Sequence, residues 1–357
     1  MQADKYRIDK HKLMYHVPRV NDWLGGKNIY PIYMEVSPSG ACNHRCTFCG
    51  LDFMGYKNRQ LKTELFKERL SEMGKLGLRS IMYAGEGEPF LHQEMAEIAR
   101  HTKKSGIDVA FTTNGTLMKE ETAGKILDVT DWIKVSINAA TQETYAKIHR
   151  AKDRDFQRVI DNMRKAAELR REMKAACTLG MQMVLLPENK SEAVPLAQIA
   201  RDIGMDYLVV KPYSQHTQSK TDQYKSIKYD EYQFLSAELK KFNSDHFQVI
   251  FRSQTMQKWD AAEHRYERCI ALPFWSYIDA GGNVWGCSVY LNDDRFLYGN
   301  IYEQTFREIW EGEKRRKSLS WVEGQMDVSC CRVNCRMDEI NRYLWELKNP
   351  VEHVNFI

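Results

Sequence analysis

Between residues 32 and 211, the sequence alternates short apolar runs with longer amphipathic stretches. The runs have the length of strands, and the stretches between them repeat apolar residues at helical spacing. The expected strands are 32–36, 80–83, 108–112, 132–137, 179–186 and 207–211, and the expected helices are 64–76, 93–105, 120–127, 156–173 and 192–203. Such alternation is typical of parallel sheets with right-handed crossovers. Six units cannot complete an eight-stranded barrel, so we predict an α/β fold, a partial (β/α)6 TIM-like barrel.

The pattern changes after about residue 215, where a polar stretch begins. The later elements we expect are a helix at 230–242, a strand at 247–251, a hairpin of 274–278 and 283–289, and helices at 305–319 and 337–347. We therefore divide the chain into an N-terminal extension (1–30), a barrel (31–215) and a small C-terminal domain (216–357).

Composition and charge exclude several classes of function. Of the 357 residues, 43% are hydrophobic and 28% are charged, and the net charge is only +4. This balance argues against an electrostatic nucleic-acid binder. Residues 1–12 contain no apolar signal segment, and Pro273 and Asp279 interrupt the longest charge-poor stretch. We expect a cytoplasmic protein that binds neither nucleic acid nor a membrane.

Nine cysteines carry most of the chemical information, at positions 42, 46, 49, 177, 269, 287, 330, 331 and 335. Their odd number, in a chain without an export signal, argues against a disulfide framework. Their clustering suggests metal binding in a reducing compartment. Cys177 stands alone, and we expect it to be a buried structural cysteine rather than a hydrogen donor.

Cys42, Cys46 and Cys49 have the spacing C-x3-C-x2-C and follow the first expected strand. In barrels of this kind, the chemistry lies at the carboxyl ends of the strands. Three thiolates suit three irons of a [4Fe–4S] cluster and leave the fourth iron free for a substrate or cofactor. Structural zinc, the alternative, requires four closed ligands, and His44 lies inside the tight loop, where it cannot easily join.

With Phe48 before the third cysteine, this motif resembles the signature of the radical S-adenosylmethionine (radical SAM) enzymes. The resemblance implies that the open iron binds the amino and carboxylate groups of SAM. The reduced cluster then cleaves SAM to methionine and a 5′-deoxyadenosyl radical. It also implies that the backbone of Phe48 contacts the adenine.

Four further segments lie where this family places its SAM contacts. Residues 84–89 resemble the family's Gly-Gly-Glu-Pro element, which binds the SAM amino group; because Glu86 looks inserted, Glu88 is favoured over it. Residues 112–115 resemble the ribose-contacting segment, and an arginine at 150 or 154 could hold the SAM carboxylate. The resemblance thus assigns to SAM the residues Phe48, Gly85, Gly87, Glu88, Asn114, Ser136, Asn138 and Arg150.

The later cysteines resemble those of SPASM and related twitch domains, which add auxiliary iron–sulfur clusters to radical SAM enzymes. Seventeen residues separate Cys269 from Cys287, and Cys330, Cys331 and Cys335 would close the site. A full SPASM domain has about seven cysteines for two clusters, and five cannot hold two complete cubanes. We therefore expect one auxiliary [4Fe–4S] cluster with Cys330 or Cys331 spare; zinc is the alternative.

These features predict a radical SAM oxidoreductase that acts on a small polar substrate such as a sugar, aminocyclitol or nucleotide sugar. The auxiliary cluster would accept the second electron. Alternatives are a sugar epimerase or dehydratase, a peptide maturase, and a non-enzymatic electron carrier. Against the maturase stand the few cysteines and the roughly thirty residues before the first strand. An electron carrier leaves residues 85–89 and 112–115 unexplained.

Substrate residues and an electron donor can also be suggested. Lys211, Tyr213 and His216 follow the sixth expected strand and could bind hydroxyl or phosphate groups. No G-x-G-x-x-G motif follows any expected strand, so we expect a flavodoxin or ferredoxin partner to supply electrons.

Overall fold

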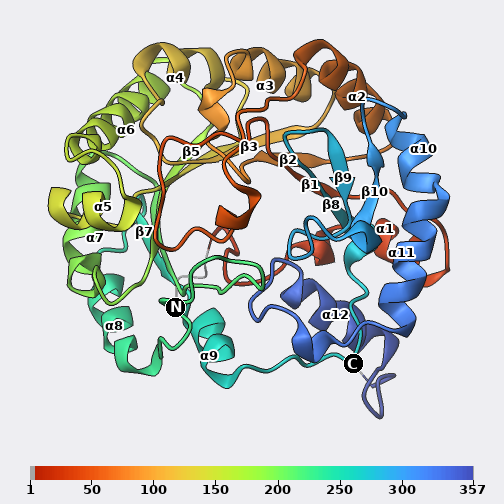
Figure 1. Cartoon of the computed structure of the whole chain (residues 1–357). Helices are drawn as coiled ribbons and strands as arrows, with labels where there is room; N and C mark the ends of the chain where they lie inside the picture. The colour runs from red at the N-terminus through yellow and green to blue at the C-terminus, as the bar shows by residue number, and fades with distance from the viewer. Residues whose placement is uncertain (1–4, 357) are drawn as a thin grey trace.

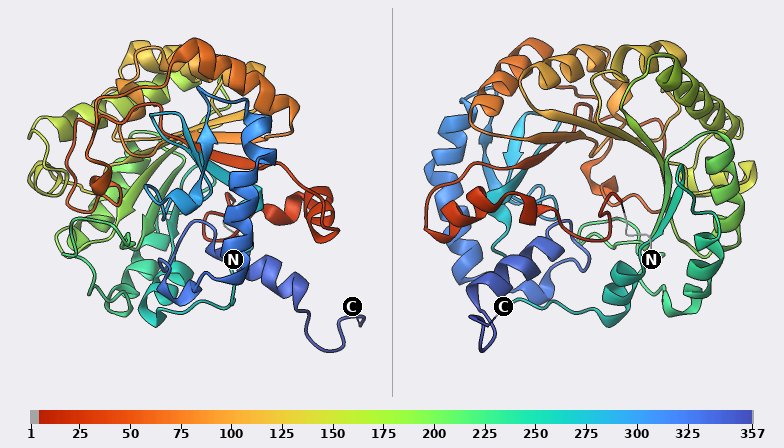
Figure 2. Two further views of the ribbon diagram at one scale, coloured as in Figure 1. Left: turned by 45° about the vertical axis from the view of Figure 1, so that its right-hand side comes forward. Right: turned by 180° about the vertical axis from the view of Figure 1, so that it is seen from behind.

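A computed structural model describes residues 5–356; residues 1–4 of the predicted N-terminal extension and residue 357 lie outside this range. The described strands form one sheet in the order β10-β9-β8-β1-β2-β3-β4-β5-β6-β7. Strands β1 to β7 are parallel, and the sheet is curved into an open barrel (Figures 1 and 2). They span Tyr33–Val36, Ser80–Tyr83, Asp108–Thr113, Trp132–Ser136, Thr178–Val184, Tyr207–Lys211 and Gln248–Phe251.

Helices cover the outer face of this sheet (Figure 1). They are α2 (Thr63–Lys75), α3 (Met95–Lys104), α4 (Glu120–Ile126), α5 (Gln142–His149), α6 (Asp155–Glu172), α7 (Ala193–Asp202) and α8 (Phe234–Lys240). Strand β4 shows how alternating residues of one strand point to opposite faces of the sheet. Ile133 and Val135 are fully buried in the core, whereas Lys134 between them points to the other face, toward the barrel interior.

The predicted partial barrel and its six strands are confirmed, and β7 adds a seventh parallel strand beside β6. After β7, α9 (Ser253–Ala261) and an extended segment cross the open side of the barrel (Figure 1). The chain then reaches the opposite edge, where β8 (Trp275–Ile278) pairs in parallel with β1. The sheet therefore continues across the predicted domain division, which stays a prediction.

The C-terminal region packs beside the first barrel units. Strands β9 (Asn283–Trp285) and β10 (Leu297–Asn300) extend the sheet in antiparallel fashion. The antiparallel pairing of β8 with β9 confirms the hairpin that the sequence predicted. The single helix expected at 305–319 is two helices, α10 (Phe306–Glu311) and α11 (Glu313–Gly324), because Gly312 between them has an extended backbone. The final helix, α12 (Asp338–Lys348), agrees with the prediction.

Sequence patterns missed the short elements α1 (Val17–Leu24), α5, α9 and β10. Helix α5 has eight residues, and Arg150, which follows it, has a left-handed backbone. The sequence therefore offered only about two helical turns in which to detect the spacing of apolar residues. Within residues 5–356, no helix combines the length and apolar character needed to cross a bilayer.

Candidate active site

The loop after β1 carries the first three cysteines at the carboxyl end of the parallel strands. All three thiols are partly buried, and the Cys49 amide donates to the Cys46 carbonyl at 3.1 Å. Burial, with a smaller contribution from Glu88, raises the pKa of Cys42 to about 12, and burial also raises the pKa of Cys46 and Cys49. Because metal ligands are thiolates, metal binding here would release protons from these thiols.

The 84–89 segment packs directly on this cysteine loop. The Glu88 amide donates to the Ala41 carbonyl at 2.8 Å. A Cβ atom on Gly87 would lie 2.3 Å from the carbonyl oxygens of Ser39 and Ala41, so only glycine fits there. Gly85 has φ +115°, a conformation that side chains rarely adopt. Gly87 therefore lets this segment pack on the chain just before Cys42, whereas Gly85 packs against Ser37 and Tyr277.

The two glutamates of this segment have different partners. Glu88 is buried and accepts from the Thr113 hydroxyl at 2.6 Å and from the Asn114 amide at 2.8 Å. Glu86 instead accepts from Arg59 at 3.1 Å and from the Ala280 amide at 2.8 Å. Glu88 thus joins the ends of β2 and β3 at the cysteine loop, whereas Glu86 joins the loop to the β8–β9 turn.

The other residues assigned to SAM are distributed around the same strand ends. The Asn114 side chain donates to Asn43 inside the cysteine motif at 2.7 Å. Ser136 accepts from Gln182 at 3.3 Å, and buried Asn138 accepts from the Val184 amide at 2.7 Å with φ +58°. Arg150 and Arg154 are exposed at the ends of α5 and α6.

Helix α5 anchors the cysteine loop. The amides of Arg45 and Thr47 donate to the carbonyls of His149 and Ile148 at 3.1 and 2.8 Å. The Phe48 ring meets the His149 ring edge-on, with centroids 5.4 Å apart. The loop that carries the cysteines is therefore held by the end of a helix that sequence patterns did not reveal.

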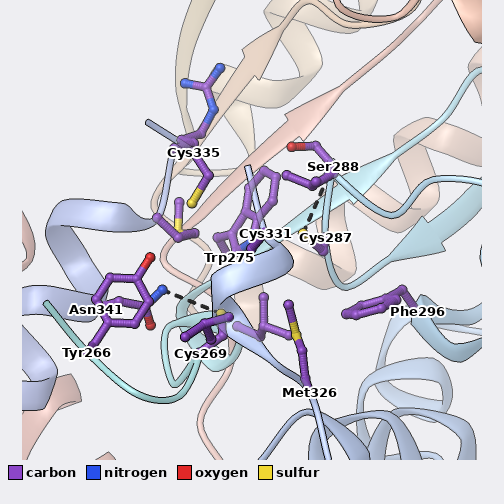
Figure 3. A pocket seen from close by; sticks show the side chains of 15 residues that line it. Tyr266, Cys269, Trp275, Cys287, Ser288, Phe296, Met326, Cys331, Cys335 and Asn341 are labelled. Carbon is purple, nitrogen blue, oxygen red and sulfur yellow. Dashed lines mark hydrogen bonds between the residues drawn. The ribbon is translucent and has the colours of Figure 1, made fainter. Parts of the chain in front are cut away.

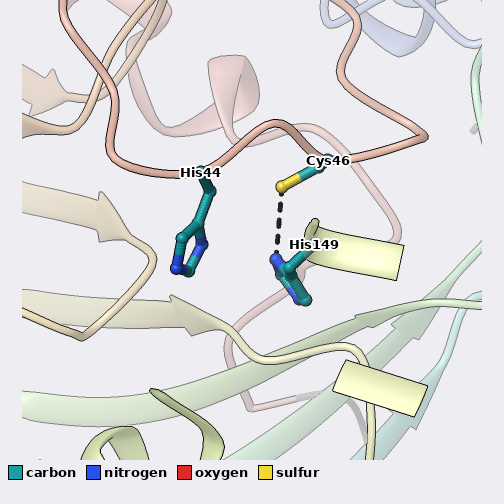
Figure 4. Close-up of side chains that lie close together, drawn as sticks. All are labelled: His44, Cys46 and His149. Atoms are coloured by element: carbon teal, nitrogen blue, oxygen red, sulfur yellow. Dashed lines mark hydrogen bonds between the residues drawn. The ribbon is translucent and has the colours of Figure 1, made fainter. Parts of the chain in front are cut away.

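His149 also contacts a cysteine directly: its Nδ1 lies 3.2 Å from the Cys46 sulfur (Figure 4). Ligand atoms of His44, Cys46 and His149 lie within 4.8 Å of one another, a set that could take a metal ion such as zinc. If Cys46 bound such an ion, it would not be available as a cluster ligand together with Cys42 and Cys49. The Nε2 atom of His149 has both an acceptor, the Ile137 carbonyl at 2.9 Å, and a donor, Asn138 at 3.3 Å. With the proton on Nε2, the ring donates to the Ile137 carbonyl and Nδ1 accepts from the Cys46 thiol; with the proton on Nδ1, Asn138 donates to Nε2 and the ring donates to a Cys46 thiolate.

A cavity of about 680 Å³ occupies the barrel interior and extends to the cysteine loop. Gly50 and Leu51, which follow Cys49, border it, and residues of the N-terminal extension line it as well. Of the three suggested substrate residues, Lys211 faces this cavity. His216 is committed to the backbone of Ser288 and Gln218 at 3.1 Å each, and Tyr213 donates to Gln215 at 3.0 Å; neither is among the described lining residues.

The C-terminal cysteines surround a second, smaller pocket (Figure 3). Its walls include four thiols, those of Cys269, Cys287, Cys331 and Cys335. Cys330 is exposed, and its sulfur lies 3.6 Å from Asp327. The sequence left open whether Cys330 or Cys331 is the spare cysteine. In the structure, Cys331 lines the pocket and Cys330 does not.

Donors around this pocket suit sulfur ligands. The Asn341 side chain lies 3.4 Å from the Cys269 sulfur, and the Val289 amide lies 3.4 Å from the Cys287 sulfur. Burial raises the pKa of Cys269 to about 12 and that of Cys331 to about 11. Four partly buried thiols, two of them with N–H donors, are the chemistry of a four-cysteine iron–sulfur or zinc site.

The pocket and the barrel cavity share a wall. Trp275, Ser288 and Cys335 line both of them. The barrel cavity is therefore bordered both by residues that follow the front cysteines and by the wall of the C-terminal cysteine pocket.

Sequence reasoning missed several residues that line the cavity or support the site. They are Lys134, Gln182, Arg332 and Arg336 in the cavity wall, and Asn43 and His149 at the cysteine loop. Lys134 and Gln182 had a usable signal, a polar residue between apolar residues of a strand. The other four sit in loops or at a helix end, where no periodic pattern marks them.

Comparison with known protein families agrees with this geometry. Residues 36–200 match the model of the radical SAM superfamily, and residues 269–336 match the SPASM model, an iron–sulfur cluster-binding domain. The first match includes the front cysteines, and the second begins at Cys269 and includes the other C-terminal cysteines.

Curated relatives share moderate identity. An AdoMet-dependent heme synthase of Methanosarcina barkeri is 26% identical over 79% of this chain and 82% of its own length. A probable GTP 3′,8-cyclase of Saccharolobus solfataricus is 28% identical over 48% of this chain. The match spans 54% of that cyclase, so the chain covers about half of its length.

Solved structures share the fold at low identity. Streptococcus suis SuiB, bound to the precursor peptide SuiA, superposes with a TM-score of 0.65 at 16% identity, over 84% of this chain and 69% of SuiB. SuiB bound to S-adenosylmethionine gives a TM-score of 0.63 over 84% of this chain and 70% of SuiB. With the two family matches at the two cysteine sites, the chain is a member of the radical SAM superfamily that carries a C-terminal SPASM iron–sulfur domain.

Proposed function

We propose that this enzyme abstracts a hydrogen atom from a small polar substrate held in the barrel cavity and oxidises it. The position of the cavity carries this proposal, since Gly50 and Leu51 beside the front cysteines and Cys335 of the rear pocket border the same space. The front cluster, when bound with SAM, would supply a 5′-deoxyadenosyl radical, and an auxiliary cluster would serve as the acceptor of the second electron. The hydrogen atom ends in deoxyadenosine, and the remaining proton leaves to solvent.

Cys42, Cys46 and Cys49 would hold the SAM-binding [4Fe–4S] cluster. Gly85, Gly87 and Glu88 are assigned to the SAM amino group, Asn114 to the ribose, Phe48 to the adenine, and Ser136, Asn138 and Arg150 or Arg154 to further SAM contacts. The close packing of Gly87 on the cysteine loop supports the first of these assignments. Glu88 also accepts hydrogen bonds from Thr113 and Asn114, so it helps to position the end of β3.

Cys269, Cys287, Cys331 and Cys335 would hold the auxiliary [4Fe–4S] cluster. Four thiols around one pocket match the four irons of one cubane. Cys330 would then be the spare cysteine, because it is exposed and faces Asp327.

Two features bear on the alternative reactions. An epimerase needs a hydrogen donor on the opposite face of the substrate, and Cys177 is buried with its sulfur directed at the Thr178 carbonyl, 3.8 Å away. Among the described residues, Cys177 is not part of the cavity wall, which favours oxidation over a thiol-dependent epimerisation. A peptide maturase remains the second candidate, since the fold resembles SuiB, whose structure contains a peptide.

Electron supply completes the proposal. We expect a cytoplasmic flavodoxin or ferredoxin to reduce the front cluster, since such clusters require low potentials. Steady turnover with NADPH alone and no added carrier would contradict this assignment.

The reaction type can be tested by isotope labelling. The anaerobically reconstituted enzyme is incubated with SAM, a reductant and a panel of sugars, cyclitols and nucleotide sugars, some deuterated at carbon, and products are followed by mass spectrometry. Oxidation should consume one SAM per product and transfer deuterium to deoxyadenosine. In deuterium oxide, a singly deuterated product of unchanged oxidation level would instead show epimerisation. Modification of peptides alone would overturn both.

His149 should tune the front cluster as a positioning residue. Because a hydrogen bond to a ligand sulfur stabilises the reduced cluster, His149→Phe should lower its midpoint potential, on the order of 50 mV. His149→Gln, which keeps a donor, should restore part of the loss. EPR-monitored redox titration measures both, with His246→Phe as the control because His246 is exposed. Equal potentials in all variants would show that the Cys46 contact has no electronic effect.

A further inference from the structure

We infer that the substrate of the barrel cavity is an anion, and that Lys134 and Lys211, assisted by Arg332, bind its phosphate or carboxylate group. This inference deepens the proposed function and rests on it, because it takes the cavity to be the substrate site. The argument comes from the placement of these cations, the pairing of the other charges, and the enclosure of the cavity.

The two lysines lie on inner positions of the barrel, two strands apart. Lys134 is on β4 and Lys211 ends β6, with β5 between them. In register, Lys134 lies beside Gly180 of β5, and Lys211 lies beside Val184 of the same strand. Gln182, halfway between those two positions, also lines the cavity. The three side chains give the wall a continuous row of hydrogen-bond donors.

Three other cations in the same wall have carboxylate partners. Arg336 lies 2.9 Å from Glu35, and Arg252 lies 3.0 Å from Asp9. Lys258 lies 2.8 Å from Asp338. Carboxylates of the protein thus neutralise these three charges.

Lys134 and Lys211 have no such partner. Within residues 5–356, neither ammonium group forms an ion pair or a hydrogen bond. Lys134 lies 5.4 Å from the Trp132 ring centroid, a cation–π contact, and the nearby Glu35 carboxylate is already paired with Arg336. Arg332 donates to the Ser214 hydroxyl at 2.7 Å, and within residues 5–356 no ion pair with a carboxylate is formed by Arg332.

Holding these charges together costs free energy. Burial, followed by Arg336 and Arg252, lowers the pKa of Lys134 to about 7. Burial and then Lys134 itself lower the pKa of Lys211 well below its ordinary value. Enclosed, unpaired charges of this kind are retained where a ligand compensates them. A cationic substrate such as an aminocyclitol would add to the repulsion, whereas a phosphate or carboxylate would relieve it.

Binding to the reconstituted holoenzyme tests the inference without any turnover. Calorimetric titration with pyrophosphate and with citrate separates phosphate from carboxylate recognition. Wild type should bind at least one of them, and Lys134→Met or Lys211→Met should weaken that binding at least tenfold. Lys134→Arg, which keeps the charge, should retain it. Lys240→Met is the matched control, since Lys240 is exposed on α8 and should bind like wild type.

Thermal melting of the anion-free proteins supplies the second measurement. Removing an enclosed amine that has no ion-pair partner should raise the melting temperature of either Lys→Met variant by about 2 °C, whereas loss of a structural lysine would lower it. Binding of neither anion by wild type, affinities unchanged within twofold in both Lys→Met variants, or a lowered melting temperature would each overturn the inference. Uncoupled deoxyadenosine formation by wild type, measured on the same samples, reports separately on the proposed function.

Discussion

Replacing Cys42, Cys46 and Cys49 together by alanine is expected to abolish formation of 5′-deoxyadenosine from SAM under dithionite. Three cysteines leave one iron of a [4Fe–4S] cluster open for SAM, so removing them removes both the cluster and its SAM site. Wild type should contain about eight irons and the triple variant about four, all in the rear pocket. Mass spectrometry of deoxyadenosine and colorimetric iron analysis measure the two effects.

Cys177→Ala serves as the control, because this buried cysteine belongs to neither cysteine site. It should keep both the iron content and the deoxyadenosine formation of wild type. Undiminished deoxyadenosine formation by the triple variant would refute the assignment of the front cysteines. Loss of all iron in that variant would mean that the rear pocket does not hold iron independently.

Cys331→Ala should remove the auxiliary cluster, whereas Cys330→Ala should leave it intact. The two residues are adjacent in sequence, but only Cys331 lines the pocket with Cys269, Cys287 and Cys335. Loss of one ligand of four should reduce the iron content from about eight to about four per chain. Deoxyadenosine formation in the absence of substrate should persist in both variants, because the front cysteines are unchanged.

The adjacent pair makes this comparison an internal control. Both variants lose one sulfur from the same short segment, so a general disturbance of folding would affect them alike. Equal loss of iron from both, or full iron in the Cys331 variant, would contradict the ligand assignment. About twelve irons in wild type would indicate a second auxiliary cluster, and zinc in place of rear-pocket iron would identify a structural zinc site.

The sequence predicted the parts of the fold that repeat. Apolar alternation located the six strands from β1 to β6, because each strand buries one face under helices and must be apolar there. The spacing of Cys42, Cys46 and Cys49 predicted the front site, because neighbouring ligands in one loop need no tertiary contact to come together. The packing of the 84–89 segment on that loop then followed from its place after β2.

Other features had no local signal. The contact between His149 and Cys46 joins residues 103 positions apart, and α5 is too short to show its periodicity. Sequence reasoning placed Tyr213 and His216 with Lys211 near the substrate. Of the three, only Lys211 is among the described residues that line the cavity. The Tyr213 hydroxyl donates to Gln215 instead, and the His216 ring contacts the Ser288 carbonyl.

By itself, the sequence determined the fold class, the two cysteine sites and the membership in the radical SAM superfamily, since these depend on periodicity and on ligands close together in the chain. Only the tertiary structure decided that Cys331 and not Cys330 faces the rear pocket, and that this pocket shares a wall with the barrel cavity. It also decided that Lys134 and Lys211 face one space, in which neither forms an ion pair or a hydrogen bond with the residues from 5 to 356. The physical reason is that parallel strands bring distant residues to one face of the sheet, and their pairing depends on register and packing that no local pattern encodes.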